Sequence, residues 1–308
     1  MISSYTVGIY PRSEDLIEAT RKNVKNLSSL YLKEKKEYVT LQKKAGLGYI
    51  CDPLVDWDDI YRPFSKLKSA NLEALNRVYE TNMFYRKISF GDSFKDAGNI
   101  IKSNLNISLL PANRSVCMVE PYTFAESHTS SKYKTREDFI ISLAKMLRKE
   151  ADTLAKSGFD LIQLLGPSIA YNPKVNFEVV KKGLEIITKG LKAKTILHLY
   201  FGDISKKLES LLDLPISGLG LDATSTPISS IKRHSFSGKL LAVGIIDSYN
   251  TKLEDSDEAI AQLNDMFLQT RPNEIYVTTN FDLQYLPKYF AVKKIFRLGQ
   301  IARGVKIA

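Results

Sequence analysis

The sequence is poor in the residues that most often bind metal ions or form disulfides. Its 308 residues include two cysteines and three histidines. Neither Cys51 nor Cys117 belongs to a CxxC motif or has a histidine close to it in the sequence, which excludes a thiol-rich zinc site. His128, His198 and His234 are too far apart along the chain to form a paired-histidine motif. We therefore expect the chain to bind no metal ion, and its cysteines to pack as small apolar residues.

Motifs of several functional classes are also absent. The sequence contains no GxSxG motif of a nucleophilic serine, and neither GxGxxG nor GxxxxGKS/T of a nucleotide-binding loop. Its apolar runs are broken by Lys, Asp or Gly, so none approaches the roughly 20 residues that span a bilayer. The opening MISSYTVGIYPRSED lacks the basic start and long apolar core of a signal peptide. These absences predict a soluble, cytoplasmic protein without a membrane partner.

Basic residues outnumber acidic ones, 44 to 34, and give a formal charge of +10. A positive potential attracts phosphates and carboxylates, so it favours acidic ligands or partners. The lysines and arginines are spread along the chain with acids between many of them, as on solvated helix faces. We therefore expect no nucleic-acid groove.

Eight short apolar runs recur through the whole length and are typical of strands. They are Tyr5 to Tyr10, Leu47 to Cys51, Ser115 to Val119, Phe159 to Leu165, Thr195 to Phe201, Gly218 to Asp222, Leu240 to Asp247 and Glu274 to Thr279. Most are continuously apolar and do not alternate, which indicates strands that are covered on both faces, as in a parallel sheet.

Helical patterns with capping residues separate these runs. In the clearest pattern, Thr135 and Asp138 form a start that resembles a capping box, and the segment ends at Ser157 and Gly158. Further helix starts are expected at Asp203, at Thr226-Pro227, and at Asp255 or Ser256. Eight strands that alternate with helices over this length predict an α/β fold, the (β/α)8 TIM barrel.

One part exceeds a minimal barrel. Between the second and third strands, residues 79–111 contain the strand-like NMFYRKISF and NISLLP around a polar centre. No Pro/Gly/Ser-rich linker sets this part apart, so we expect an inserted hairpin within a single domain over 1–308. The region up to Lys44 is also long for one crossover helix.

In such barrels, functional residues follow the C-terminal ends of the strands. The polar residues in those positions are Arg12, Asp52, Asp56, Glu120, Tyr122, Gln163, Ser168, His198, Asp203, Asp222, Thr224, Asp247, Asn250, Asn280 and Asp282. Taken singly, each Asp, Asn or Ser is expected to cap the following helix, and His198 to be a hydrogen-bonded core histidine. From these residues alone the sequence predicts a polar mouth but no reaction.

Several segments together resemble cobalamin-independent methionine synthase, specifically its N-terminal barrel. GIYPR at 8–12 resembles the family's GFPR, ETNMFYRK at 80–87 its DTNYHY, and EPYTF at 120–124 its GPVTF. YVTLQKKAGLGYI at 38–50 and AVGIIDSYN at 242–250 resemble HWxxQKxAGIDLL and AGVVDGRN. The most specific segment, LYFGDISKKLESLLDLPISGLGLD at 199–222, is similar to TYFGDLGDNLETLLSLPVDGLHLD. The resemblance is ordered and nearly full-length.

The resemblance implies which zinc ligands this chain lacks. In the family two barrels face each other, and the C-terminal one holds zinc through one His, two Cys and one Glu. Where that barrel has its HxC motif, this sequence has His198 and then Tyr200, and Phe281 takes the place of the second cysteine. Residues 164–167 replace the acidic IDEP element. Without thiolates, zinc cannot activate homocysteine in the family's manner.

The expected grip on the folate donor is weakened too. The family's RELK motif after FPR corresponds to Glu14, Asp15, Leu16 and Ile17, which reverses its charge. A lysine before DTNYHY corresponds to Arg77, which can still hold a carboxylate or phosphate. The methyl donor therefore stays open between a folate, another pterin and a corrinoid.

The resemblance implies three alternative functions. The first is a noncatalytic subunit, a counterpart of the N-terminal barrel that pairs with a separately encoded zinc-bearing barrel in methionine biosynthesis, with a methyl-carrier protein as another candidate partner. Its partner face would include Arg12, Arg77, Asn82, Tyr200 and Asp203. The second is an independent methyltransferase, for which His198, Asp222 and Asp247 are candidates, with Glu120 also at the mouth. The third is a cofactor-binding module.

Overall fold

The main sheet contains eight parallel strands. The structure is a computed structural model and describes residues 2–306. The strands are β1 (Ile2–Tyr5), β2 (Ile50–Cys51), β5 (Arg114–Val119), β7 (Leu161–Leu165), β8 (Lys194–Leu199), β9 (Gly218–Asp222), β10 (Leu240–Ile246) and β11 (Glu274–Thr279). They hydrogen-bond in the order β1-β11-β10-β9-β8-β7-β5-β2, and each neighbouring pair is parallel.

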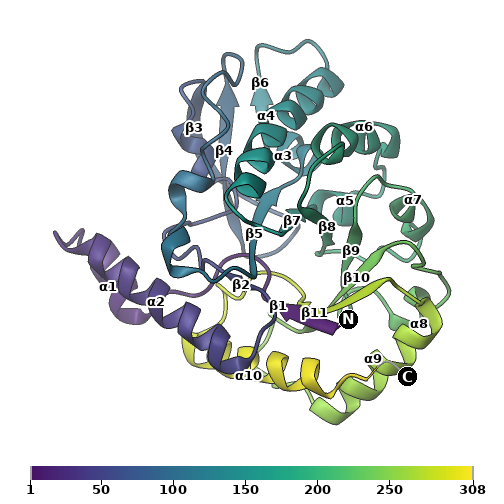
Figure 1. Cartoon of the computed structure of the whole chain (residues 1–308). Coiled ribbons are helices and arrows are strands. Elements are labelled where there is room, and N and C mark those ends of the chain that lie inside the picture. The colour runs from purple at the N-terminus through teal and green to yellow at the C-terminus, as the bar shows by residue number, and fades with distance from the viewer. Residues whose placement is uncertain (1, 307–308) are drawn as a thin grey trace.

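The two end strands of this sheet approach each other and nearly close a barrel. The backbone N–H groups of Gly48 and Tyr49, just before β2, both donate to the carbonyl oxygen of Ser4 in β1, at 3.0 Å each. A Cβ on Gly48 would lie 2.0 Å from Oγ of Ser3, so a larger residue there would displace the Ser3 side chain. Helices surround the strands (Figure 1). The predicted (β/α)8 TIM barrel is confirmed.

Ten α-helices occur in the described residues. They are α1 (Glu14–Arg21), α2 (Leu27–Ala45), α3 (Pro121–Ser127), α4 (Arg136–Lys156), α5 (Pro167–Tyr171), α6 (Phe177–Thr188), α7 (Leu208–Leu212), α8 (Ile228–Ile231), α9 (Ser256–Thr270) and α10 (Lys288–Gly304). The expected cap of α4 is present, because Oγ1 of Thr135 accepts the N–H of Asp138 at 3.0 Å. Among residues 2–306, no helix is both long and apolar enough for a membrane crossing.

Two expected helix starts are wrong. Asp203 accepts the N–H of Ser205 in a turn, and the next helix, α7, begins only at Leu208. Thr226 does not cap α8, because its Oγ1 accepts the N–H of Ile204 at 3.2 Å. At α9, by contrast, Asp255 is the capping residue.

The first predicted strand extends beyond the observed one. The strand β1 ends at Tyr5, although the apolar run continues to Tyr10. Beyond Tyr5 the backbone N–H groups bind side chains, with Val7 donating to Thr279 Oγ1 at 2.9 Å and Ile9 to Asp282 Oδ1 at 3.0 Å. The segment is buried across the end of the sheet without joining its ladder.

A second sheet of three strands lies beside the barrel, and its strands come from the part of the sequence between β2 and α4. It has the order β3 (Ala70–Arg77), β4 (Phe84–Phe90) and β6 (Thr129–Ser130). β4 falls within the expected insertion, but its antiparallel partner is β3, which precedes residue 79. The second expected strand, NISLLP, instead contains a 3-10 turn, η3 (Ile107–Leu109). Two more 3-10 turns, η1 (Arg62–Lys66) and η2 (Lys102–Asn104), flank the hairpin in sequence.

Candidate functional site at the barrel mouth

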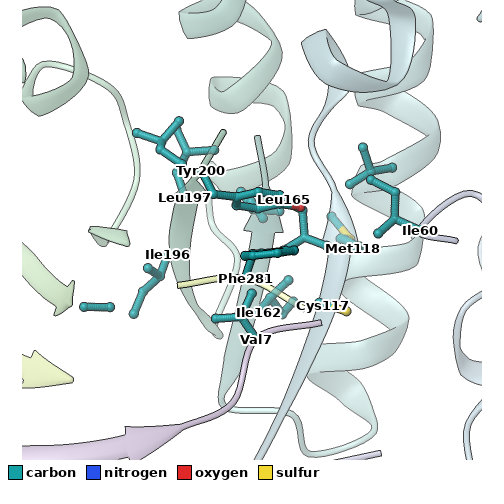
Figure 2. Packing of buried hydrophobic residues seen from close by; sticks show 14 of the residues in the cluster. Val7, Ile60, Cys117, Met118, Ile162, Leu165, Ile196, Leu197, Tyr200 and Phe281 are labelled. Atoms are coloured by element: carbon teal, nitrogen blue, oxygen red, sulfur yellow. The ribbon is translucent and has the colours of Figure 1, made fainter. Parts of the chain in front are cut away.

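Aromatic side chains fill the C-terminal mouth of the barrel. Tyr200, directly after β8, and Phe281, after β11, are both fully buried. Their rings stack with centroids 5.9 Å apart and an interplanar angle of 21°, and Figure 2 shows the two rings lying one above the other among Leu165, Met118 and Val7. A barrel mouth that is usually open to substrate is therefore occupied by the chain's own side chains.

Further rings continue this cluster outwards to the surface. Phe281 contacts Phe201 at 5.0 Å and Tyr249 at 4.6 Å between centroids. Tyr285 follows at 6.4 Å from Phe281. Tyr249 and Tyr285 are 45% and 41% exposed. We call Tyr79, Tyr171, Tyr200, Phe201, Tyr249, Phe281 and Tyr285 the aromatic plug.

The hairpin contributes Tyr79 to this plug. The Tyr79 ring lies 5.2 Å from Phe201 and 5.4 Å from Tyr171, and its hydroxyl is 3.0 Å from Oγ of Ser168. Tyr79 and Phe201 have φ angles of 52° and 68°, in the left-handed region that bulky residues rarely adopt. The backbone on both sides of this ring contact is thus strained, which is common at functional sites.

His198 lies inside the barrel and is bonded to another strand. The hydroxyl of Tyr5 lies 2.9 Å from its Nε2, and a Cβ on Gly220 would lie 2.4 Å from its Nδ1. Burial lowers the pKa of His198 to about 3, so the ring is neutral at physiological pH. This environment is that of the hydrogen-bonded core histidine that the sequence favours.

The predicted carboxylates bind nearby backbone groups. Glu120 caps α3 by accepting the N–H groups of Tyr122 and Thr123. The buried Asp222 accepts the N–H of Thr224 at 2.9 Å, and Asp247 accepts that of Tyr249 at 2.7 Å. Burial raises the pKa of Asp247. With Asp203 in its own turn, all four carboxylates organise loops, and no structural observation assigns them a reaction.

Asn280 ties three of these loops together. Its Nδ2 donates to Asp222 Oδ1 at 3.3 Å and to Thr224 Oγ1 at 3.1 Å, and its Oδ1 accepts the N–H of Ser248 at 2.9 Å. The loops after β9, β10 and β11 are therefore held in one arrangement beneath Tyr249 and Phe281.

Two buried carboxyls at the mouth have strongly raised pKa values. Burial raises the pKa of Glu120 and of Asp282 to about 7 each. Asp282 accepts the N–H of Ile9 and an N–H of Gln284, but no cationic side chain in the described range forms an ion pair with it. The hydroxyl of Tyr200 is also buried without a hydrogen-bond partner among residues 2–306. The mouth is polar below its rings but closed.

The remaining predicted residues lie around this mouth and not in it. Arg12 holds the loop after β2, because its Nε donates to the carbonyl oxygen of Val55 at 2.5 Å and its Nη2 pairs with Asp58 at 2.8 Å. Arg77 and Asn82 are exposed at the hairpin turn. Nη2 of Arg77 donates to Oδ1 of Asn82 at 3.3 Å. The structure thus joins Arg77 to Asn82, but not to Arg12.

A groove of about 610 Å³ lies between the hairpin, the end of α3 and α5. Four cationic side chains and one acidic side chain line it: Arg77, Arg86, Lys87, Arg136 and Glu126. The rings of Tyr79 and Tyr171 form part of its wall. Arg86, Lys87 and Arg136 form ion pairs with Asp59, Glu73 and Glu126. Arg77 forms no ion pair among residues 2–306, and its guanidinium beside the aromatic surface suits an organic anion.

The zinc ligands of the family do not fit this mouth. At the two positions where the sequence resemblance places the family's cysteines, Tyr200 and Phe281 stack on each other, and Nε2 of His198 lies 2.9 Å from the hydroxyl of Tyr5. Cys51 and Cys117 instead line a small cavity with Gln163. Within the part of the chain that the structure describes, no group of three His, Cys, Asp or Glu side chains is arranged to hold a metal ion.

Sequence reasoning missed most of the aromatic plug. Tyr79, Tyr171, Phe201, Tyr249 and Tyr285 are not among the predicted residues, because the prediction rests on polar groups after each strand. A signal was present, since Tyr200, Tyr249 and Phe281 each lie within three positions of the end of a strand.

Comparisons with known proteins agree with this fold. Residues 67–270 match the family described as "Cobalamin-independent synthase, N-terminal domain". Methionine synthase of Sulfolobus acidocaldarius is 24% identical, over 97% of this chain and 90% of that protein. For methionine synthase of Saccharolobus solfataricus the identity is 23%, over 100% of this chain and 95% of the relative.

Solved structures share the fold at lower identity. The B12-independent methionine synthase from Shewanella sp. W3-18-1, in complex with selenomethionine, superimposes with a TM-score of 0.74 at 19% identity, over 98% of this chain and 97% of that one. A putative vitamin-B12 independent methionine synthase from Listeria monocytogenes gives 0.72 at 16% identity, over 98% of both chains. This chain belongs to the family of the N-terminal domain of cobalamin-independent methionine synthase.

Proposed function

We propose that this chain is a noncatalytic barrel that supports methyl transfer to homocysteine by a separate, zinc-bearing methionine synthase barrel. The observation that carries the proposal is the stacked pair Tyr200 and Phe281. By the sequence resemblance, these rings stand at the positions of the family's two zinc-binding cysteines, and they are fully buried. A barrel closed in this way serves as a partner and does not itself activate a thiol.

The exposed part of the aromatic plug is the proposed contact surface for that partner. Tyr171, Tyr249 and Tyr285 are between 40% and 45% exposed at the mouth. Tyrosine combines a large apolar ring with a polar tip and is enriched in protein interfaces. The zinc ion, in this proposal, is bound by the partner barrel alone.

The methyl donor in this proposal is an anion that binds near the hairpin. Arg77 lines the groove beside the plug and can bind a carboxylate or phosphate, whereas Lys87 and Arg136 are paired with Glu73 and Glu126. A folate, another pterin and a corrinoid on a carrier protein all meet this description. The proposal places the assembly in the cytoplasm, where the two free, buried cysteines stay reduced.

The test is reconstitution with a zinc-bearing methionine synthase barrel from the same organism, recovered with this chain by affinity capture. Homocysteine methylation is measured with and without this chain, for each candidate donor. We expect activity to fall when the chain is omitted. Methylation by this chain alone, or unchanged activity of the partner without it, contradicts the proposal, and the first of these favours an independent methyltransferase.

Two variants separate the mouth from the rest of the surface. Tyr249→Glu with Tyr285→Glu places charge on the exposed rings, and we expect it to prevent assembly without unfolding the chain. Phe296→Glu is the matched control, because Phe296 is an aromatic residue on α10 that is 44% exposed and lies outside the plug. Equal assembly of both variants contradicts a contact at the mouth.

A further inference from the structure

The hairpin presents an unpaired edge strand. β3 is an end strand of the order β3-β4-β6, and in residues 2–306 no strand pairs with its other edge. Seven of its eight residues, 71–77, are exposed, and Figure 1 shows β3 at the outer margin of the molecule. Natural proteins protect such edges with proline, charged side chains, bulges or covering elements, because free N–H and C=O groups attract another strand. The strand β3 has a bulge and two charged residues, but no proline and, in the part of the chain that the structure describes, no covering strand.

The edge also exposes two leucines. Leu72 and Leu75 are 59% and 60% exposed, and the segment ANLEALNR contains no proline and no lysine. Leu72 pairs with Ile88 and Leu75 with Arg86, with a bulge between the two pairs. Ile88 and Arg86 are two residues apart on β4 and share a face, so the bulge brings both leucines to the same face of the sheet.

The sequence of this edge is self-complementary. If two copies of β3 pair antiparallel about a two-fold axis between residues 73 and 74, Asn71 lies opposite Asn76 of the other copy. Leu72 then lies opposite Leu75, and Leu75 opposite Leu72, as an isologous contact requires. The charged residues do not clash in this register, because Glu73 lies opposite Ala74, and Arg77 opposite Ala70.

We propose that the chain forms a homodimer through antiparallel pairing of β3 with β3 of a second copy. The pairing extends each three-stranded sheet into one six-stranded sheet and satisfies the free backbone groups of both edges. Because each copy carries the same bulge, the register is kept on both sides of it. Four leucines, two from each copy, then meet on one face, which explains why apolar residues are exposed on an edge strand.

This dimer does not depend on the proposed function. The contact uses β3, whereas the methionine synthase partner is assigned to the aromatic plug. Either assembly can therefore fail without affecting the other.

The first test is sedimentation of the whole chain over a range of concentrations. We expect a concentration-dependent dimer, and we expect Leu75→Lys to raise its dissociation constant by at least about 30-fold, because it removes both leucine contacts near the two-fold axis. Leu268→Lys is the matched control, since Leu268 is 55% exposed on α9. A chain that stays monomeric up to about 1 mM overturns the proposal, as does a Leu75→Lys variant that dimerises as tightly as the control.

A cross-link tests the register itself. Asn71→Cys with Asn76→Cys places two cysteines opposite each other across the proposed contact, within reach of an intermolecular disulfide. Asn71→Cys alone is the control, because its two copies lie five positions apart along the pair. The native Cys51 and Cys117 are buried and do not compete. A dimer that forms without this cross-link, or that the single variant cross-links equally well, overturns the register.

Discussion

Gly8 leaves no space for a side chain next to Asp282. A Cβ on Gly8 would lie 1.4 Å from Oδ1 of Asp282, and its φ angle is 67°. Oδ1 accepts the N–H of Ile9 at this point, so the carboxyl holds the chain where it crosses the barrel mouth. Gly8→Ala must displace either this carboxyl or the backbone. We expect it to lower the free energy of unfolding by about 3 kcal/mol or more, measured by urea denaturation.

Gly190→Ala is the control for the backbone angle alone. Gly190 has a φ of 72°, but nothing lies within 4 Å of its Cβ position. We expect this substitution to cost about 1 kcal/mol, the strain of a left-handed alanine. Equal losses for the two variants would show that the contact with Asp282 contributes nothing.

The raised pKa of Asp282 predicts a pH-dependent stability. Burial raises this pKa to about 7 in the folded protein, whereas an unfolded aspartate titrates near 4. The folded state therefore holds the proton more tightly, and this contribution to stability is fully present below about pH 4 and is lost as the pH rises through about 7. Asp282→Asn keeps a neutral side chain, so we expect the variant to lack this loss, about 2–4 kcal/mol in total.

The measurement is the difference in unfolding free energy between the wild type and Asp282→Asn from pH 4.5 to pH 8. The neutral, buried His128 and His198 contribute equally to both proteins and cancel in the difference. Asp160→Asn, at an exposed carboxyl, is the control for the loss of one negative charge. A difference that stays constant from pH 4.5 to pH 7 contradicts a buried, protonated Asp282.

Strands that are buried on both faces could be read from the sequence. β9 and β11 have the predicted bounds, because their apolar residues coincide with the hydrogen-bonded ladder. The run from Tyr5 to Tyr10 predicts one strand, but only its first residue belongs to β1. An apolar run reports burial, and the N–H groups of Val7 and Ile9 bind side chains instead of a neighbouring strand.

The hairpin and the plug show why the rest was not predictable. β3 is exposed, and its bulge between Leu72 and Leu75 interrupts the alternation of apolar and polar residues, so its pairing with β4 is what makes it a strand. The sequence predicts Tyr200 as a mouth residue. It does not predict the stacking on Phe281, because the two residues are 81 positions apart. Local sequence gives the position of each ring after its strand, whereas the closed mouth depends on barrel geometry that brings the strand ends together.

Tyr79 is expected to hold the hairpin against the barrel. Tyr79→Phe removes the hydroxyl contact with Ser168, which we expect to lower the unfolding free energy by about 1 kcal/mol. Tyr79→Ala also removes the Tyr79 ring, which packs on Phe201 and Tyr171, and the expected loss of unfolding free energy is about 3 kcal/mol. Amide hydrogen exchange over β4 measures whether this loss is local. We expect faster exchange in the alanine variant, and unchanged exchange there would contradict a role of Tyr79 in fixing the hairpin.

A buried ion pair fixes the other side of the hairpin. Nε of Arg86 lies 2.8 Å from Oδ2 of Asp59, and both side chains are at most 9% exposed. Arg86→Ala leaves the buried Asp59 without its cation, so we expect a loss of about 3–5 kcal/mol in thermal or urea unfolding. Arg62→Ala is the matched control, because Arg62 is 44% exposed in its pair with Asp58 and an exposed pair contributes about 1 kcal/mol or less.

The double variant identifies the cause of that loss. Asp59→Asn added to Arg86→Met removes both charges. In the wild type the N–H of Tyr61 donates to Asp59 Oδ1 at 2.8 Å, and the asparagine keeps an acceptor for it. If the uncompensated carboxylate is the main cause, the double variant recovers part of the stability that Arg86→Met alone loses. Losses that simply add would assign the effect to the packing of the arginine side chain, since no coupling between the two charges would then remain.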